Sequence, residues 1–246
     1  MKNSKKDKKS LNELIYGAHP IIEICRAKRR KIISIYTTKP LPKSWKRVER
    51  YLPPKISNIQ YVSRSVLDRM TGTTEHMGIA AWVTPFQYRK KSFDPKIQKN
   101  ILLLDSIQDV RNLGAILRSA YCTGIDGVVL CKKRSALLTA AAFKASAGLA
   151  EHLEIYVAPS LKHAVLELKK TGYNLYMTVL KNGKNALKVK YEEPRCLVIG
   201  NEATGISREV LEYGELITLP QRDPDASYNA SVAAGIFLFL ITADQK

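Results

Sequence analysis

The chain has 246 residues, a hydrophobic content of 45% and a formal net charge of +18. This is the composition of a globular protein that can bury a core, in one large or two small domains. No apolar run reaches the ~20 residues of a membrane-spanning helix, and the basic N-terminus lacks the apolar stretch of a secretory signal. We therefore expect a cytoplasmic protein.

The four cysteines are scattered and show no spacing typical of a metal site. They are Cys25, Cys122, Cys131 and Cys196. We predict reduced, buried thiols, with no disulfide and no bound metal.

The positive charge is concentrated in the first part of the chain. Residues 1–96 contain 22 basic and 7 acidic residues, a net charge of +15, whereas residues 97–246 contain 18 and 15, a net charge of +3. A basic module beside a nearly neutral one indicates a polyanion-binding part next to a chemical part. If the excess charge only reflected a solvated surface in a lysine-rich proteome, residues 97–246 would also carry a large positive net charge. The predicted nucleic-acid contacts are Arg26, Lys28, Arg29, Arg30 and Lys31.

Residues 1–10 are charged and without periodicity, and we predict a disordered basic tail. Over residues 11–84, short strands alternate with short helices, which predicts a small α/β domain. The expected helices span residues 16–30, 45–51 and 66–71, and the expected strands span residues 31–36, 59–62 and 79–83. Residues 85–99 contain two prolines and no periodic pattern, so we expect a linker there.

From residue 100 to residue 246 the alternation is stricter, and the strands are continuously apolar. The expected strands span residues 101–104, 127–131, 154–157, 174–179, 195–200 and 215–219, and the expected helices span residues 112–123, 136–147, 161–170, 207–213 and 232–243. Continuous apolar strands between helices predict a parallel sheet that helices cover on both faces.

Three loops that follow predicted strands carry candidate site residues, because ligands of open α/β sheets bind beyond the carboxyl ends of strands. The first leads into a helix that holds Asn112 and Arg118, whose planar guanidinium suits a phosphate. Gly114 keeps the start of that helix small, so a ligand could approach its amides. The second loop, residues 200–207, holds Glu202 between glycines.

The third loop places Asn229 and Ser231 ahead of an uncharged helix. Each of these polar residues could instead be an ordinary capping or turn residue. The chain has neither a dinucleotide-binding G-x-G-x-x-G nor a GK[ST] phosphate loop. The sequence shows no pairing of its four histidines with serine, cysteine or acid, which argues against a hydrolase triad.

Read together, the three loops resemble the motifs of the SpoU (TrmH) branch of the SPOUT RNA 2′-O-ribose methyltransferases. The resemblance rests on Asn-Leu-Gly-Ala-Ile-Leu-Arg-Ser-Ala at 112–120, Ile-Gly-Asn-Glu-Ala-Thr-Gly-Ile at 199–206, and Leu-Pro at 219–220 followed by Asn-Ala-Ser-Val-Ala-Ala-Gly at 229–235. Residues 16–20, 62–68 and 76–80 resemble the beginning and end of the L30e-like substrate-binding domain of the same family.

The resemblance implies an α/β fold with a C-terminal α/β-knot, a deep trefoil knot in a parallel sheet, behind a small N-terminal L30e-like α/β domain. It also implies S-adenosylmethionine as cofactor, no metal, and a homodimer. By motif position the cofactor would contact Gly200, Leu219 and Tyr228, and the catalytic set would be Asn112, Arg118, Glu202, Asn229 and Ser231. The family usually has leucine where this chain has Tyr228.

The pairing of domains is most similar to bacterial enzymes that methylate a guanosine of 23S rRNA, so this is the expected activity. Three alternatives stay open at this point. They are a tRNA ribose methyltransferase of the same branch, a resistance methylase acting on an rRNA adenosine, and a non-catalytic RNA-binding protein of ribosome assembly.

Overall fold

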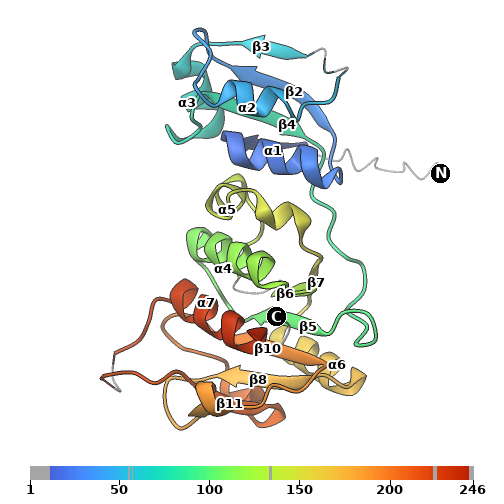
Figure 1. Cartoon of the computed structure of the whole chain (residues 1–246), viewed down its shortest axis with the longest axis vertical. Helices are drawn as coiled ribbons and strands as arrows, with labels where there is room; N and C mark the ends of the chain where they lie inside the picture. Colours follow the sequence, from blue (N-terminus) through green and yellow to red (C-terminus); the bar gives the residue numbers. More distant parts are fainter. Residues whose placement is uncertain (1–11, 55, 57, 133–134, 224–225, 244–246) are drawn as a thin grey trace, which may run out of the picture. The chain divides into compact units, whose positions relative to one another are not determined.

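The structure is a computed structural model that describes residues 12–243 except 55, 57, 133–134 and 224–225. The predicted basic tail lies outside the described residues. The chain divides into two compact units, residues 1–87 and 88–246, and each is described by itself (Figure 1). None of the helices in the described ranges has the length and apolar character needed to cross a membrane.

The first unit is built on a four-stranded mixed sheet in the order β1-β4-β2-β3. β4 pairs antiparallel with both β1 and β2, and β3 pairs parallel with β2. The strands are β1 (Glu13–Tyr16), β2 (Ile32–Thr37), β3 (Ile59–Tyr61) and β4 (Ile79–Val83), and the helices are α1 (Ala18–Ala27), α2 (Trp45–Glu49) and α3 (Arg64–Thr71). Strand β1 was not predicted: only its last residue, Tyr16, fell within an expected helix, and residues 13–15 were assigned to no element.

The second unit contains a seven-stranded sheet in the order β7-β6-β5-β10-β8-β11-β9, and every pair in it is parallel. This confirms the predicted parallel sheet. The strands are β5 (Asn100–Leu104), β6 (Gly127–Cys131), β7 (Ile155–Ala158), β8 (Asn174–Thr178), β9 (Lys184–Asn185), β10 (Arg195–Ile199) and β11 (Glu215–Thr218). The insertion of β10 between β5 and β8 is consistent with the knotted topology that the resemblance implies.

Helices cover this sheet, so all residues of β5, β6 and β10 are buried (Figure 1). The helices are α4 (Val110–Thr123), α5 (Ala140–Ala145), α6 (Leu161–Thr171) and α7 (Ala230–Ile241), with 3₁₀ turns η1 (Leu149–His152), η2 (Ala186–Lys188) and η3 (Arg208–Tyr213). α4 packs against both α5 and α7, whereas α6 packs against η3 and shares a buried cluster with it.

Helix α5 is shorter than predicted, because the hydroxyl of Thr139 caps it by accepting from the Ala142 N–H and the chain leaves the helix at Ser146. Its close packing also corrects our interpretation of Gly114. A Cβ at Gly114 would lie 2.4 Å from the Cβ of Ala145 and 2.6 Å from the carbonyl oxygen of Ala142. The small residue therefore lets α5, and not a ligand, approach α4.

Candidate functional site

A cavity of about 450 Å³ lies beyond the carboxyl ends of β8, β10 and β11. Its volume is in the range typical of sites for small organic ligands. The lining includes Thr178, Leu180, Ile199, Gly200, Glu202, Ile206, Arg208, Leu219, Gln221, Tyr228 and Phe237. All three residues predicted to contact the cofactor, Gly200, Leu219 and Tyr228, thus line the same cavity.

The loop after β10 is compact because its own polar groups hold it. The backbones of Asn201 and Gly205 exchange hydrogen bonds of 3.1 and 2.9 Å, and the side-chain oxygen of Asn201 accepts from the N–H of Ala203 at 2.9 Å. Gly205 has a φ of +65°, which favours glycine. A Cβ on Gly200 would lie 2.3 Å from backbone atoms of residues 205 and 206. The loop therefore requires glycine at position 200.

The first two predicted loops meet through a hydrogen bond between Asn112 and Glu202. Asp109 caps α4 by accepting from the Arg111 N–H at 2.7 Å, so Asn112 is not the capping residue. Its side-chain amide instead donates to Oε1 of Glu202 at 2.9 Å. Asn201 donates to the other carboxylate oxygen at 3.3 Å. Two amides from different parts of the chain thus orient one exposed carboxylate at the cavity.

The third loop pairs Asn229 with Ser231. Oδ1 of Asn229 accepts from the N–H of Ser231 at 2.9 Å and from its hydroxyl at 2.6 Å, which makes Asn229 the N-cap of α7. Asn229 and Ser231 therefore shape the entry into α7. Their neighbours Tyr228 and Ala230 line the cavity.

Arg118 is hydrogen-bonded to neither pair. It is exposed on α4, and within the described ranges it makes no hydrogen bond or ion pair and does not line the cavity. Its guanidinium faces solvent, where a charged macromolecule can reach it. The structure thus joins Asn112 to Glu202 and Asn229 to Ser231, and leaves Arg118 accessible.

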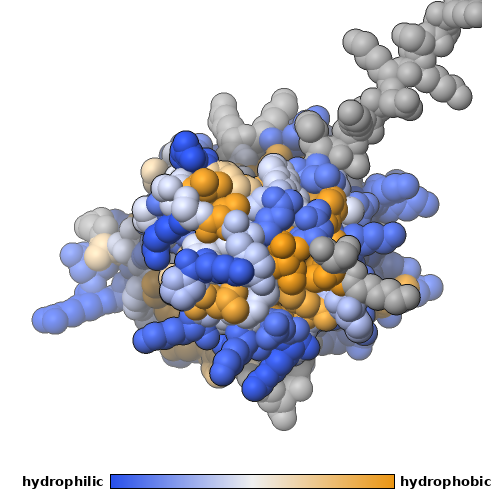
Figure 2. All heavy atoms as spheres, turned by 90° about the horizontal axis from the view of Figure 1, so that it is seen from above, coloured by the Kyte–Doolittle hydropathy of each residue, from blue (hydrophilic) through white to orange (hydrophobic). Residues whose placement is uncertain are grey.

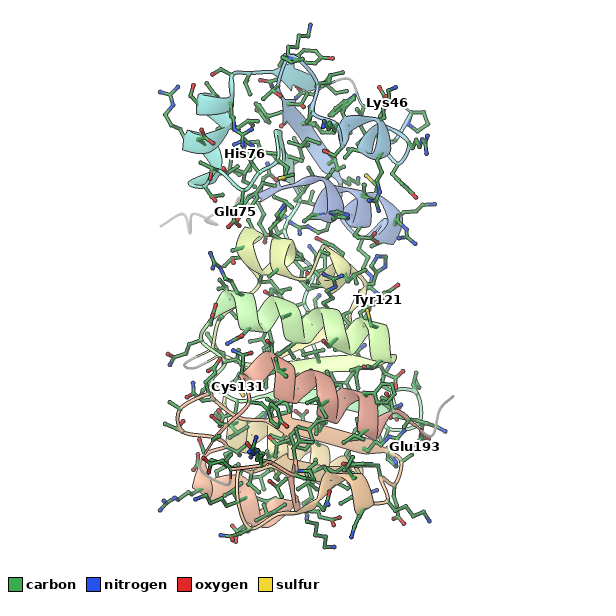
Figure 3. The ribbon with its side chains drawn as sticks, turned by 60° about the vertical axis from the view of Figure 1, so that its left-hand side comes forward. Lys46, Glu75, His76, Tyr121, Cys131 and Glu193 are labelled. Atoms are coloured by element: carbon green, nitrogen blue, oxygen red, sulfur yellow. The ribbon has the colours of Figure 1, made fainter. Side chains whose placement is uncertain are left out.

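The thiols are less uniformly buried than we predicted. Cys131 and Cys196 are buried, but Cys122 is exposed, because it lies on the solvent side of α4. Cys131, the last residue of β6, is labelled in Figure 3. Burial, together with the negative charge of Asp105, raises its pKa to about 12. No group of three potential metal ligands is found among the residues that the structure describes.

The predicted RNA contacts in the first unit need one correction. Arg30 is buried, its guanidinium lies 2.6 Å from the carboxylate of Glu13, and its Nε donates to the carbonyl of Thr84 at 2.7 Å. It therefore fastens β1 to the end of β4 and cannot contact RNA. Arg26 is exposed but bonds the neighbouring Glu23 at 3.0 Å.

Lys28, Arg29 and Lys31 are exposed, because the helix ends at Lys28 in the left-handed conformation and the chain turns outward. A second feature of this unit could not be expected from the sequence pattern. Tyr61 on β3 is 50% exposed, and the Nζ of Lys39 lies 4.2 Å from the centre of its ring. Figure 2 shows apolar side chains surrounded by hydrophilic ones on the face in view. An exposed aromatic ring beside a cation is typical of single-stranded nucleic-acid binding.

Comparison with known proteins gives two family matches. The model of the SpoU rRNA methylase family matches residues 99–239, and the model for RNA 2′-O ribose methyltransferase substrate binding matches residues 14–89. A Staphylococcus saprophyticus protein named for the TrmH family of tRNA/rRNA methyltransferases is 33% identical over 190 residues, 74% of this chain and 75% of that protein.

Among solved structures, the SpoU methyltransferase AviRb from Streptomyces viridochromogenes in complex with AdoMet has a TM-score of 0.80 and 19% identity, over 99% of this chain and 94% of that one. An AdoMet-bound rRNA methyltransferase from Sinorhizobium meliloti has a TM-score of 0.77 and 20% identity, over 95% and 87%. A TrmH/SpoU tRNA-modifying enzyme of A. aeolicus covers only 62% of this chain and 80% of its own, with a TM-score of 0.53 and 25% identity.

The structural likenesses show the fold, and the family models cover both units. Because the methylase model spans more than half of the sequence, the chain belongs to the SpoU/TrmH family of RNA 2′-O-methyltransferases, which take the methyl group from S-adenosylmethionine.

Proposed function

We propose that the protein transfers the methyl group of S-adenosylmethionine to the ribose 2′-hydroxyl of a guanosine in 23S (large-subunit) rRNA. The observation that carries the catalytic part of this proposal is the Asn112–Glu202 hydrogen bond of 2.9 Å beside the cavity. It joins residues from the first and second predicted loops at the place where a cofactor and an RNA ribose would meet.

The cavity fits the donor in size and chemistry. Its volume of about 450 Å³ suits a nucleoside carrying an amino-acid tail. Apolar side chains such as Leu180, Leu219 and Phe237 can pack against the adenosine, and the loop after Gly200 offers backbone polar groups. When bound, S-adenosylmethionine supplies an electrophilic methyl group on a sulfonium ion.

The protein's contribution is positioning, because the methyl group is already activated. Glu202, held by Asn112, is placed to accept a hydrogen bond from the ribose, and Asn229 with Ser231 shapes the loop that faces both substrates. The 2′-hydroxyl must also lose a proton. A guanidinium offers five N–H donors and no acceptor, so we assign Arg118 to binding the hydroxyl or the neighbouring phosphate.

The first unit supplies RNA affinity in this proposal. Its exposed cations, among them Lys28, Arg29 and Lys31, would contact phosphates without regard to sequence. The ring of Tyr61, with Lys39 beside it, would stack on an unpaired base. Folded rRNA offers both unpaired bases and closely spaced phosphates.

Ribosomal RNA is favoured over tRNA by the domain content. The S. meliloti rRNA methyltransferase aligns over 95% of this chain, whereas the A. aeolicus tRNA-modifying enzyme aligns over 62%. The first unit is thus shared with an enzyme named for rRNA. A deletion strain tests this choice, because mapping its 2′-O-methyl marks should show one guanosine missing from large-subunit rRNA. A mark missing only from tRNA would support the second candidate, a tRNA methyltransferase.

We also propose a homodimer formed through α7. Val232, Ile236 and Phe239 follow a helical spacing and are 50, 36 and 57% exposed. An apolar stripe of this kind is rarely left in water, and a second copy can cover it with the same stripe. Phe239→Lys should convert the protein to a monomer in analytical ultracentrifugation. A monomeric wild type would contradict this part of the proposal.

A further inference from the structure

The buried carboxylate of Asp105 is hydrogen-bonded to the loop of residues 200–207, which carries Glu202. It has no role in the reaction described so far. Asp105 directly follows β5 and is 3% exposed. Its Oδ2 accepts from the N–H of Ser207 at 3.1 Å and from the hydroxyl of Ser207 at 3.2 Å, and its Oδ1 accepts from the hydroxyl of Ser106 at 2.8 Å. No basic residue in the described ranges forms an ion pair with it. Burying such a charge is costly unless hydrogen bonds satisfy it.

These hydrogen bonds reach the far end of the loop that carries Glu202. Ser207 closes the loop that begins at Gly200, so Asp105 fixes its end. The loop's beginning is fixed at the same place, because Asn201 donates to the carbonyl of Ser106 at 2.8 Å and the backbone N–H of Asp105 donates to the carbonyl of Ile199 at 2.8 Å.

Hydrogen bonds thus hold both ends of the loop to residues at the carboxyl end of β5. Between them, the backbone hydrogen bonds between Asn201 and Gly205 keep residues 201–205 in a tight turn. Glu202 lies on this segment, and its distance to Asn112 on α4 depends on where the segment is held. A shift of Ser207 would therefore be transmitted to the carboxylate of Glu202.

We infer that Asp105 is a positioning residue for methyl transfer: by binding Ser207 and Ser106, it holds the 200–207 loop so that Glu202 meets Asn112 and the ribose. The inference rests on the proposed role of Glu202. It does not require Asp105 to touch either substrate.

Substitutions at Asp105 test this with purified full-length protein, AdoMet and total rRNA. Asp105→Ala removes both acceptors, and kcat at saturating AdoMet should fall about 100-fold, as expected for a misplacement of about 1 Å. Asp105→Asn can restore the contacts, because its oxygen can accept from Ser207 and its amide can donate to Ser106. It should therefore retain kcat within about fivefold.

A matched control lies at the opposite end of β5. The carboxylate of Asp126 accepts from the N–H of Asn100 at 2.8 Å, so Asp126→Ala also removes a carboxylate that joins backbone segments, but far from the cavity. It should leave kcat unchanged. A loss of kcat in this variant equal to that of Asp105→Ala would make the effect a general loss of packing, which would overturn the inference.

A double-mutant cycle with Glu202→Ala separates positioning from general destabilisation. If Asp105 acts through Glu202, adding Asp105→Ala to Glu202→Ala should slow the enzyme no further than about twofold. If the double variant instead loses kcat by the product of the two separate factors, the inference about Asp105 is overturned while the role of Glu202 stands. Wild-type kcat in Asp105→Ala would have the same meaning. Wild-type kcat in Glu202→Ala would remove the proposed role of Glu202 and the inference with it.

If Asp105→Ala does not fold, Asn201→Ala releases the same loop from its other end. Its kcat should fall by the same factor, and adding Asn201→Ala to Glu202→Ala should lower kcat no further. If the folded double variant instead loses kcat by the product of the two separate factors, the inference is overturned.

Discussion

Gly200 is the position at which a single added methyl group should disable the site. A Cβ there would lie 2.3 Å from the carbonyl carbon of Gly205 and from the nitrogen of Ile206, where ordinary contact begins at 3.4 Å. Both neighbours are backbone atoms and cannot turn aside as a side chain would. Residues 205–206 would have to move by about 1 Å, which widens the turn that carries Glu202.

From that displacement we expect Gly200→Ala to lose about 100-fold in kcat/KM for methyl transfer, because errors of about 1 Å in a reacting geometry have this effect. Forcing a methyl group into a packed site should also lower the free energy of unfolding by about 1–3 kcal/mol. AdoMet affinity should fall as well, since the displaced residues line the cavity.

The assay combines tritiated methyl transfer to rRNA, calorimetric titration with AdoMet, and thermal unfolding. Gly235→Ala is the control, because its Cβ would meet only the hydroxyl oxygen of Ser119 at 3.6 Å and glycine inside a helix is unfavourable by up to about 1 kcal/mol. That variant should be as stable as the wild type or more so, and fully active. Wild-type activity and AdoMet affinity in Gly200→Ala would show that the loop tolerates a Cβ at position 200, contrary to this prediction.

Four further predictions concern single side chains. Arg118→Ala should abolish methyl transfer while calorimetry still detects AdoMet binding. Arg30→Met should lower the free energy of unfolding by about 2–3 kcal/mol in denaturant titrations, since Glu13 loses its buried partner. Tyr61→Ala should weaken single-stranded RNA binding about 10- to 100-fold in anisotropy titrations, whereas Tyr61→Phe should not. With a thiol reagent at mildly alkaline pH, the exposed Cys122 should react in the folded protein. Cys131 should react only after unfolding, because it is buried and burial raises the pKa of Cys131 to about 12.

The strands of the second unit could be predicted because their sequence pattern is local. β10 is a run of five buried residues, and such runs between helices are typical of a parallel sheet. The order of the strands could not be predicted, because β10 enters between β5 and β8, strands far apart along the chain. β9 was missed because two residues carry no periodic signal.

The candidate site was only partly predictable for a similar reason. The resemblance placed Asn112 and Glu202 in one set, but their hydrogen bond spans 90 positions of sequence and follows from the fold alone. Arg30 was misread because basic residues are seldom buried, and its partner Glu13 lies on the strand that was not predicted. Asp105 gave no signal, because a single aspartate after a strand is typical of any turn.

The most direct test of the account is methyl transfer in vitro by the purified full-length chain. Large-subunit rRNA and tRNA from the deletion strain would each be incubated with labelled AdoMet, digested to nucleosides and separated by mass spectrometry. We expect 2′-O-methylguanosine in large-subunit rRNA, none added to tRNA, and no product with Arg118→Ala. Product on tRNA alone, a base-methylated product, or unchanged turnover by Arg118→Ala would contradict it.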